Sequence, residues 1–145
     1  MRRPEAKLLF QNSHNRLYFL KEINAIMICP EGIMDKEAFA EANHALLRWG
    51  EQLQVTRVIL NEQMLLRMPP SSRLWLITSF LTREEVKVAL KQIEDISVVN
   101  SPSVALSTLM RVLHRFAGSL IGKTFHYYPT LEDLLAVQEA ISKAS

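Results

Sequence analysis

Paired hydroxyl side chains beside prolines are the groups of this sequence with the clearest chemical potential. Ser71 and Ser72 directly follow Pro69 and Pro70, where an apolar helical pattern begins. A phosphate on either serine would lie beside free backbone amides at the positive end of the helix dipole, so the pair is a candidate phospho-acceptor site. The structural alternative, which we favour, is that one of the two serines caps the helix.

A second polar group, Asn100, Ser101 and Ser103, stands where an apolar strand pattern gives way to a helical one. Ligands of open α/β sheets bind beyond the carboxyl ends of the strands, and free amides at a helix start suit an anion. No glycine-rich loop accompanies these residues, so we do not expect a nucleotide. The structural alternative is again a helix start, with Ser101 as the cap and Pro102 at the first helical position.

Large apolar side chains gather in a segment that we expect to be an irregular loop. They form a candidate site for an apolar ligand or a protein interface, because methionine packs adaptably and exposed apolar patches mark interfaces. The alternative is a loop folded over the core. The residues are Met64, Leu65, Leu66 and Met68, with Trp75 in the helix that follows.

Residue types with catalytic or metal-binding potential are otherwise scattered. The four histidines show no metal-ligand spacing, and no serine-nucleophile motif is present. These histidines are His14, His44, His114 and His126. His114 stands beside Arg111 and Arg115, and we expect it on the solvated side of its helix. Cys29 is expected to be a buried, inert thiol. The sequence therefore predicts a non-enzymatic protein with no metal and no cofactor.

Composition limits the class of protein. The chain has 145 residues, of which 48% are hydrophobic and 22% charged, and this suits one domain spanning residues 1–145. A net charge of +2 without a long basic block argues against a nucleic-acid partner. No apolar run approaches the roughly 18 residues of a membrane span, and no signal peptide is evident. The single cysteine fits a reducing compartment, so we expect a cytoplasmic protein.

The first half of the chain contains the strand and helix patterns that must position these groups. Apolar runs at residues 7–10, 16–20 and 25–29 predict closely spaced antiparallel strands. Asp35 is a predicted N-cap for an amphipathic helix through Leu53. The β-branched run at residues 58–60 is typical of a central strand covered on both faces, with a functional site expected beyond its carboxyl end.

The second half alternates helices with strands. A helix is predicted after Pro70, and Thr82 with Glu85 forms a predicted capping box, after which residues 86–90 fit a helix or a strand. Strands are predicted at residues 95–100 and 124–128, and each precedes a helix, the last one starting at Thr130 with Asp133 in its capping box. The predicted fold class is α/β: a mixed sheet of four to six strands with N-terminal antiparallel strands, parallel βαβ crossovers and helices packed on the sheet.

This order resembles the SpoIIAA-like group of the STAS superfamily, the anti-sigma-factor antagonists, over about the whole chain. The resemblance rests on three stretches. They are the strand at residues 58–60 with the Pro-Ser-Ser helix start that follows its loop, Val98-Val99-Asn100-Ser101-Pro102, and the closing strand and acidic-started helix at residues 125–135. The resemblance implies a SpoIIAA/STAS-like fold and a regulatory role through a protein partner.

The resemblance also bears on the paired serines. In the regulatory STAS proteins, the loop after the central strand carries Asp-Ser-Ser-Gly, and a partner kinase phosphorylates a serine there. The nearest counterpart is Pro70-Ser71-Ser72-Arg73, which keeps both serines but has proline in place of the aspartate and arginine in place of the glycine.

Two functions follow from these observations. The first is a non-enzymatic regulatory or protein-interaction domain, whose partner is another protein or a second copy of the chain in a homodimer. The second is a carrier or sensor of a small apolar or lipid-like ligand, held between the loop at residues 64–68 and a helix. A related architecture, the CRAL-TRIO lipid-carrier fold, has a comparable sheet over an apolar cavity and lends weight to the second function.

Overall fold

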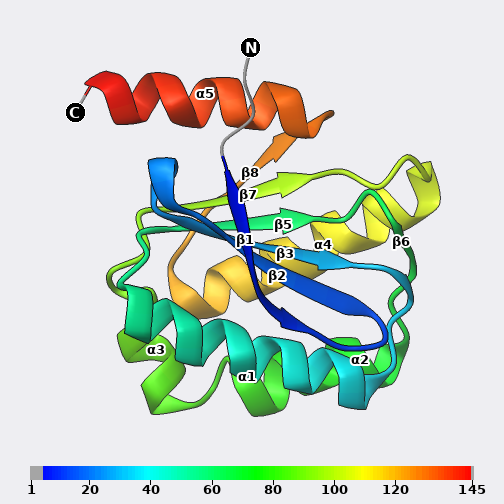
Figure 1. Cartoon of the computed structure of the whole chain (residues 1–145). Coiled ribbons are helices and arrows are strands. Elements are labelled where there is room, and N and C mark those ends of the chain that lie inside the picture. The colour runs from blue at the N-terminus through cyan, green and yellow to red at the C-terminus, as the bar shows by residue number, and fades with distance from the viewer. Residues whose placement is uncertain (1–4, 145) are drawn as a thin grey trace.

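A six-stranded mixed sheet forms the centre of the molecule, which is described here over residues 5–144 by a computed structural model. In sheet order its strands are β1 (Ala6–Gln11), β2 (Asn15–Leu20), β3 (Ala25–Pro30), β5 (Arg57–Asn61), β7 (Asp95–Val99) and β8 (Phe125–Tyr128). The pairs β1–β2 and β2–β3 are antiparallel, whereas β3, β5, β7 and β8 are parallel neighbours. The predicted fold class is confirmed, and Figure 1 shows its arrangement.

Helices cover both faces of the sheet, unequally. They are α1 (Lys36–Leu53), α2 (Pro70–Trp75) with the π-helical turn η2 (Leu76–Phe80), α3 (Glu84–Leu90), α4 (Val104–Ile121) and α5 (Leu131–Ala144), and a 3-10 turn, η1 (Lys21–Ile23), joins β2 to β3. In Figure 1, α5 lies on one side of the sheet, and α1 and α3 lie on the other. We call these the α5 face and the α1 face.

The central strand β5 explains why both faces need helices. Val58 belongs to the core cluster that contains Ala42 and Ala45 of α1, and Leu60 packs against that cluster. Ile59, between them, belongs to the cluster under α5. Successive side chains of a strand point to opposite faces, so a continuous β-branched run requires cover on both. The prediction of a central strand at residues 58–60 is confirmed.

Some of the N-cap residues predicted from the sequence are found at the observed helix starts, and others are not. Asp35 caps α1, because its carboxylate accepts from the backbone N–H of Ala38 at 2.8 Å. Thr130 accepts from the N–H of Asp133 at 3.1 Å at the start of α5. The predicted serine caps at Ser71 or Ser72 are wrong, since Pro69 is the N-cap of α2 and Pro70 takes its first position. Proline fits there because that position needs no N–H donor, and both serines therefore lie inside the helix.

Two further caps are shifted by a few residues. Ser103, not Ser101, caps α4, because the Ser103 hydroxyl accepts from the N–H of Leu106 at 3.3 Å. Ser101 instead accepts from the N–H of Ser103 at 3.2 Å. The predicted capping box at Thr82 is also wrong: Thr82 donates back to the carbonyl of Thr78 at 2.9 Å, and α3 starts only after Arg83. In each case a serine or threonine bonds the local backbone instead of the helix end.

The segment at residues 64–68 is not an irregular loop. Its centre is a short strand, β6 (Leu65–Arg67), which pairs in parallel with β4 (Gly32–Ile33) to form a separate two-stranded sheet. Backbone bonds from Gly32 N to Met64 O and from Met34 N to Arg67 O, each 3.0 Å, fix this pairing. The backbone groups of the segment are thus paired, and its side chains divide between core and solvent.

Candidate ligand-binding site

An apolar cavity of about 160 Å³ lies on the α1 face, between the sheet and helices α1, α3 and α4. Strands β3, β5, β7 and β8 contribute Ile28, Val58, Leu60, Ile96 and Phe125 to its lining. Side chains from the helices and from η2 complete the wall, and the cavity is partly open to solvent. Protein interiors seldom contain voids larger than a water molecule, so a cavity of this size is a feature to explain.

Three ionisable side chains belong to the lining of this largely apolar cavity: the exposed Glu51 and the buried Glu62 and His114. Glu62 and His114 are 4% and 3% exposed, and both line the cavity. Glu62 Oε2 lies 3.1 Å from His114 Nε2, and the phenol oxygen of Tyr127 lies 3.1 Å from His114 Nδ1. The three side chains form a chain of hydrogen bonds that we call the Glu62 relay.

The first hydrogen bond of the relay has a defined direction. A carboxylate oxygen only accepts hydrogen bonds, so Glu62 Oε2 accepts from the N–H at His114 Nε2. The direction of the second bond, between His114 Nδ1 and the Tyr127 hydroxyl, depends on whether Nδ1 carries a proton, since a hydroxyl both donates and accepts. The carboxylate thus has one hydrogen bond from a neighbouring side chain inside a largely apolar wall.

The local sequence places each member of the relay. Glu62 is the first residue after β5, and its N–H donates to Val99 O at 3.0 Å, which holds it at the carboxyl end of the sheet. His114 lies on the buried side of α4, where its ring stacks on Phe125 at 4.9 Å between centroids. Tyr127 lies in β8, two residues after Phe125, so the same strand carries the stacking ring and the hydroxyl.

The position of His114 corrects the sequence interpretation, which placed it on the solvated side of its helix with Arg111 and Arg115. The two arginines are exposed, but His114 is buried. A signal was available in the helix pattern. Met110, Leu113, His114 and Ala117 are separated by the three- and four-residue steps that place side chains on one helical face. The partner Glu62 is 52 residues away, and no local pattern identifies it.

Electrostatics at the outer end of the relay keep Tyr127 protonated. Burial raises the pKa of the Tyr127 phenol above its usual value, and the negative charge of Glu62 acts in the same direction. Arg111 and Arg115 lower the pKa, and the Arg111 guanidinium lies 4.5 Å from the centroid of the Tyr127 ring. The raised pKa therefore keeps the Tyr127 hydroxyl protonated at neutral pH.

An aromatic cluster flanks the cavity beside α2 and η2. Trp75 stacks on Phe80 at 5.3 Å and meets Phe39 edge-on at 5.8 Å, and both of these phenylalanines line the cavity. The His44 ring contacts Trp75 and Phe80 edge-on at 5.8 and 5.9 Å. Burial lowers the pKa of His44, and Arg83 and Arg48 add to this effect while Glu85 opposes it. Trp75, a candidate from the sequence, thus supports two lining side chains.

The predicted apolar candidates of residues 64–68 divide into two sets. Leu65 and Met68 are 1% and 2% exposed and belong to the core cluster beneath α1 and α4, and Met68 lines the cavity. Met64 and Leu66 are 62% and 75% exposed. The cavity itself lies between the sheet and the helices of the α1 face, not between this segment and a helix.

The predicted polar candidate residues do not form one group, and each makes its own contacts. Ser71 is exposed, whereas Ser72 is fully buried and its hydroxyl donates to Met34 O at 2.7 Å. Asn100 donates from its backbone and side chain to Tyr128 O, at 3.1 and 3.3 Å. Phosphorylation of a serine and anion binding at residues 100–103 stay predictions.

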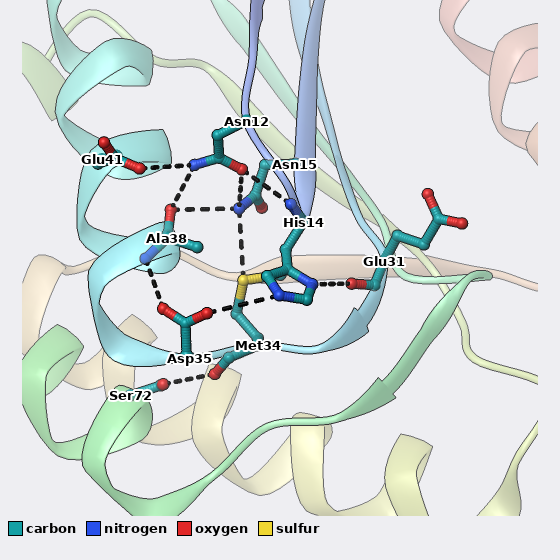
Figure 2. Close-up of polar contacts among 9 residues, drawn as sticks. All are labelled: Asn12, His14, Asn15, Glu31, Met34, Asp35, Ala38, Glu41 and Ser72. Atoms are coloured by element: carbon teal, nitrogen blue, oxygen red, sulfur yellow. Dashed lines mark hydrogen bonds and ion pairs between the residues drawn. The ribbon is translucent and has the colours of Figure 1, made fainter.

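A second polar network lies at the start of α1 (Figure 2). Asn12 and Asn15 both donate through Nδ2 to the carbonyl of Ala38, at 3.0 and 3.2 Å. Asn12 Oδ1 accepts from the N–H of His14 at 3.0 Å, and His14 Nε2 lies 3.5 Å from Asp35 Oδ2. We call this group the Asn15 network. Its hydrogen bonds connect the turn between β1 and β2 to the first turn of α1.

Other chemical groups give no further site. Burial raises the pKa of Cys29 to about 11, so its thiol stays protonated at neutral pH. Across residues 5–144, no three His, Cys, Asp or Glu side chains come together in a group that could hold a metal ion. In this described part of the chain, no helix is both long and apolar enough to cross a membrane.

Comparisons with known proteins identify the fold. No protein-family model matches the chain, and no match is found among curated proteins. The solved structure of the anti-sigma factor antagonist SpoIIAA in its unphosphorylated form matches with a TM-score of 0.52 and 17% identity, covering 97% of each chain. An uncharacterized protein of the DUF3478 family with a SpoIIAA-like fold, from Shewanella loihica PV-4, matches with a TM-score of 0.48 and 9% identity, covering 92% of each chain. The expected resemblance to SpoIIAA is thereby confirmed at the level of the fold.

Proposed function

We propose that this SpoIIAA-like chain is a non-enzymatic regulatory domain that binds a small apolar ligand in the cavity of its α1 face. The cavity carries the proposal. An engineered cavity of similar size in another protein stays dry and binds benzene. The cavity is partly open to solvent, so an apolar ligand that enters it removes apolar wall from water. Burial of apolar surface favours binding by roughly 25 cal/mol per Å².

The regulatory part of the proposal rests on the fold. SpoIIAA is an anti-sigma factor antagonist, a protein that acts on another protein. The proposal extends that kind of output to this chain, with ligand occupancy as its input and a cytoplasmic location expected from the single cysteine. The predicted apolar-ligand function is kept, and its site moves from residues 64–68 to the cavity.

A cavity-filling substitution tests ligand binding. Ala117 of α4 is 3% exposed and lines the cavity, so Ala117→Leu places a larger side chain inside it. Toluene at ten times its dissociation constant stabilises the wild type by about 1.4 kcal/mol. For a chain of this length this is about 3–6 °C in Tm. We expect Ala117→Leu to lose this shift, measured by differential scanning fluorimetry and isothermal titration calorimetry.

The matched control is Ala136→Leu, the same change in α5 on the other face of the sheet. It should keep the toluene shift of the wild type. If Ala117→Leu does not fold, Ala89→Leu in α3 fills the cavity from another side. A wild type with no saturable toluene binding, or with binding that survives in a folded cavity-filled variant, would contradict the proposal.

A second candidate function is self-association through the β4–β6 sheet, favoured by the exposure of Met64 and Leu66. Large exposed apolar side chains beside each other mark interfaces. We expect a homodimer at micromolar concentration that the double substitution Met64→Ser, Leu66→Ser converts to a monomer in light scattering. Leu65 is unsuitable for this test because it is a core residue.

The control for this surface is Val112→Ser, which removes an equally apolar side chain that is 60% exposed on α4. It should leave the dimer intact. A wild type that is monomeric up to about 100 μM, far above a micromolar dissociation constant, would remove the homodimer.

A further inference from the structure

Glu62 has an unused oxygen in the wall of the cavity. Oε2 is bonded to His114, and among residues 5–144 no hydrogen-bond donor lies within reach of Oε1. In this part of the chain, the side-chain atoms that are sealed from solvent without a partner are Asn15 Oδ1 and Gln138 Oε1. Glu62 Oε1 is not among them, so it keeps accessible surface although its residue is 4% exposed. It is an acceptor left open where the cavity is lined.

A buried carboxylate with one open oxygen favours a specific partner. A hydrogen bond to an ionised acceptor is roughly twice as strong as one between neutral groups. The surrounding lining is apolar, so solvent screens this oxygen less than it screens a surface carboxylate. An anionic ligand would be repelled by the same charge, and a ligand that only accepts hydrogen bonds would leave the oxygen unpaired.

We propose that Glu62 selects ligands with a compact apolar body, about the size of one aromatic ring, and a single neutral hydroxyl that donates to Glu62 Oε1. The inference rests on the proposed function and names its ligand class. His114 and Tyr127 are positioning residues, because His114 bonds Glu62 Oε2 and Tyr127 bonds His114, which orients the carboxylate toward the ligand hydroxyl. The body of the ligand lies among Leu60, Met110 and Leu113, and its hydroxyl lies at the carboxyl end of β5.

Phenol and toluene test this selection, since they share one ring and differ by a hydroxyl in place of a methyl group. In an apolar cavity without a polar partner, burying the hydroxyl weakens phenol relative to toluene by about tenfold or more. With Glu62 as acceptor the order reverses. We expect wild-type protein to bind phenol at least about tenfold more tightly than toluene in isothermal titration calorimetry.

Glu62→Gln identifies the residue responsible. The glutamine oxygen replaces Oε2 as acceptor from His114, so its amide N–H₂ takes the place of Oε1. The phenol hydroxyl then accepts from a neutral amide and no longer donates to a carboxylate, which is a weaker hydrogen bond. We expect the phenol-to-toluene affinity ratio to fall by about tenfold or more while toluene affinity stays within about twofold. A purely structural role for Glu62 would weaken both ligands together.

The outcomes separate the two proposals. If neither ligand binds the wild type, the proposed function fails. If toluene binds as tightly as phenol or more tightly, the cavity is a binding site and the selection by Glu62 is wrong. A phenol-to-toluene ratio unchanged in Glu62→Gln would also overturn it. Should that variant not fold, the order of the two ligands on the wild type alone decides.

Discussion

The Glu62 relay and the Asn15 network each contain buried polar side chains, but the partners of these side chains differ in kind. Asn15 is 2% exposed, and its amide bonds the carbonyl of Ala38 and Asn12 Oδ1, so it connects backbone segments (Figure 2). Glu62 bonds through its side chain to another ionisable side chain, and both of these line a cavity. The first grouping joins backbone segments, and the second places an ionisable pair in the wall of a cavity.

The difference shows how to separate structural from functional polar groups in a fold without a catalytic motif. The Nδ2 group of Asn15 bonds the backbone across a turn, and its unpaired Oδ1 is sealed from solvent, so a ligand has no access to it. A charged carboxylate in an apolar wall costs stability unless a partner compensates it, and one histidine uses only part of its bonding capacity. The remaining capacity is available to a ligand.

The largest expected effect is the loss of one partner from the relay. His114→Phe keeps a ring against Phe125 but leaves the charge of Glu62 without its donor. We expect the free energy of unfolding to fall by about 3–5 kcal/mol in urea titrations. Adding Glu62→Leu to this variant removes the unpaired charge and should restore at least about half of the loss.

The stability of His114→Phe is the strongest test of whether Glu62 is a buried charge. A loss below about 1 kcal/mol for His114→Phe would mean that water in the cavity solvates Glu62 as well as His114 does. The relay would then be a solvated surface pair, and its contrast with the Asn15 network would disappear.

A smaller loss is expected in the Asn15 network. Asn15→Ala removes the bonds to Asn12 and Ala38 but leaves the Ala38 carbonyl bonded to Asn12. We expect a loss of about 1–3 kcal/mol, with toluene and phenol affinities unchanged. Ser13→Ala, an exposed change in the same turn, should stay within about 0.5 kcal/mol of the wild type. Altered ligand affinity in Asn15→Ala would remove the distinction between the two groupings.

The smallest expected effect is a pH dependence of the free energy of unfolding that arises from His44, beside the cavity. The pKa of His44 is lowered in the folded protein, chiefly by burial against Trp75 and Phe80. Below its ordinary value of about 6.5, the unfolded chain therefore binds more protons than the folded chain. Stability should fall as the pH drops from about 6.5, and the slope should be smaller in His44→Gln. An equal slope in both proteins would assign the dependence to other groups.

The fold could be predicted from the sequence because its signals are local. Short apolar runs located every strand of the main sheet, and helical spacing located the long helices. The β-branched run at residues 58–60 indicated cover on both faces. Asp35 was identified as a cap because its partner is three residues away. The caps that failed are also instructive. Proline at the first position of α2 moved the helix start ahead of Ser71, and Ser101 bonded its own turn instead of the end of α4.

The site was only partly accessible to sequence analysis. A functional site was predicted beyond the carboxyl end of the central strand, and Glu62, the acceptor in our proposal, follows that strand. Its pairing with His114 depends on how α4 packs on the sheet, and two neighbouring arginines concealed that His114 lies on the buried stripe. The cavity could not be predicted, because it arises from the spacing of α1, α3 and α4 over the sheet.

Binding of an apolar molecule in the cavity is the central claim, and a methyl NMR titration with toluene tests it most directly. The account predicts saturable shifts for methyl groups of the lining residues Val58, Ile96 and Leu113, with Leu20 and Leu134 on the α5 face unmoved. Shifts that do not saturate, or that affect both faces of the sheet equally, would contradict it.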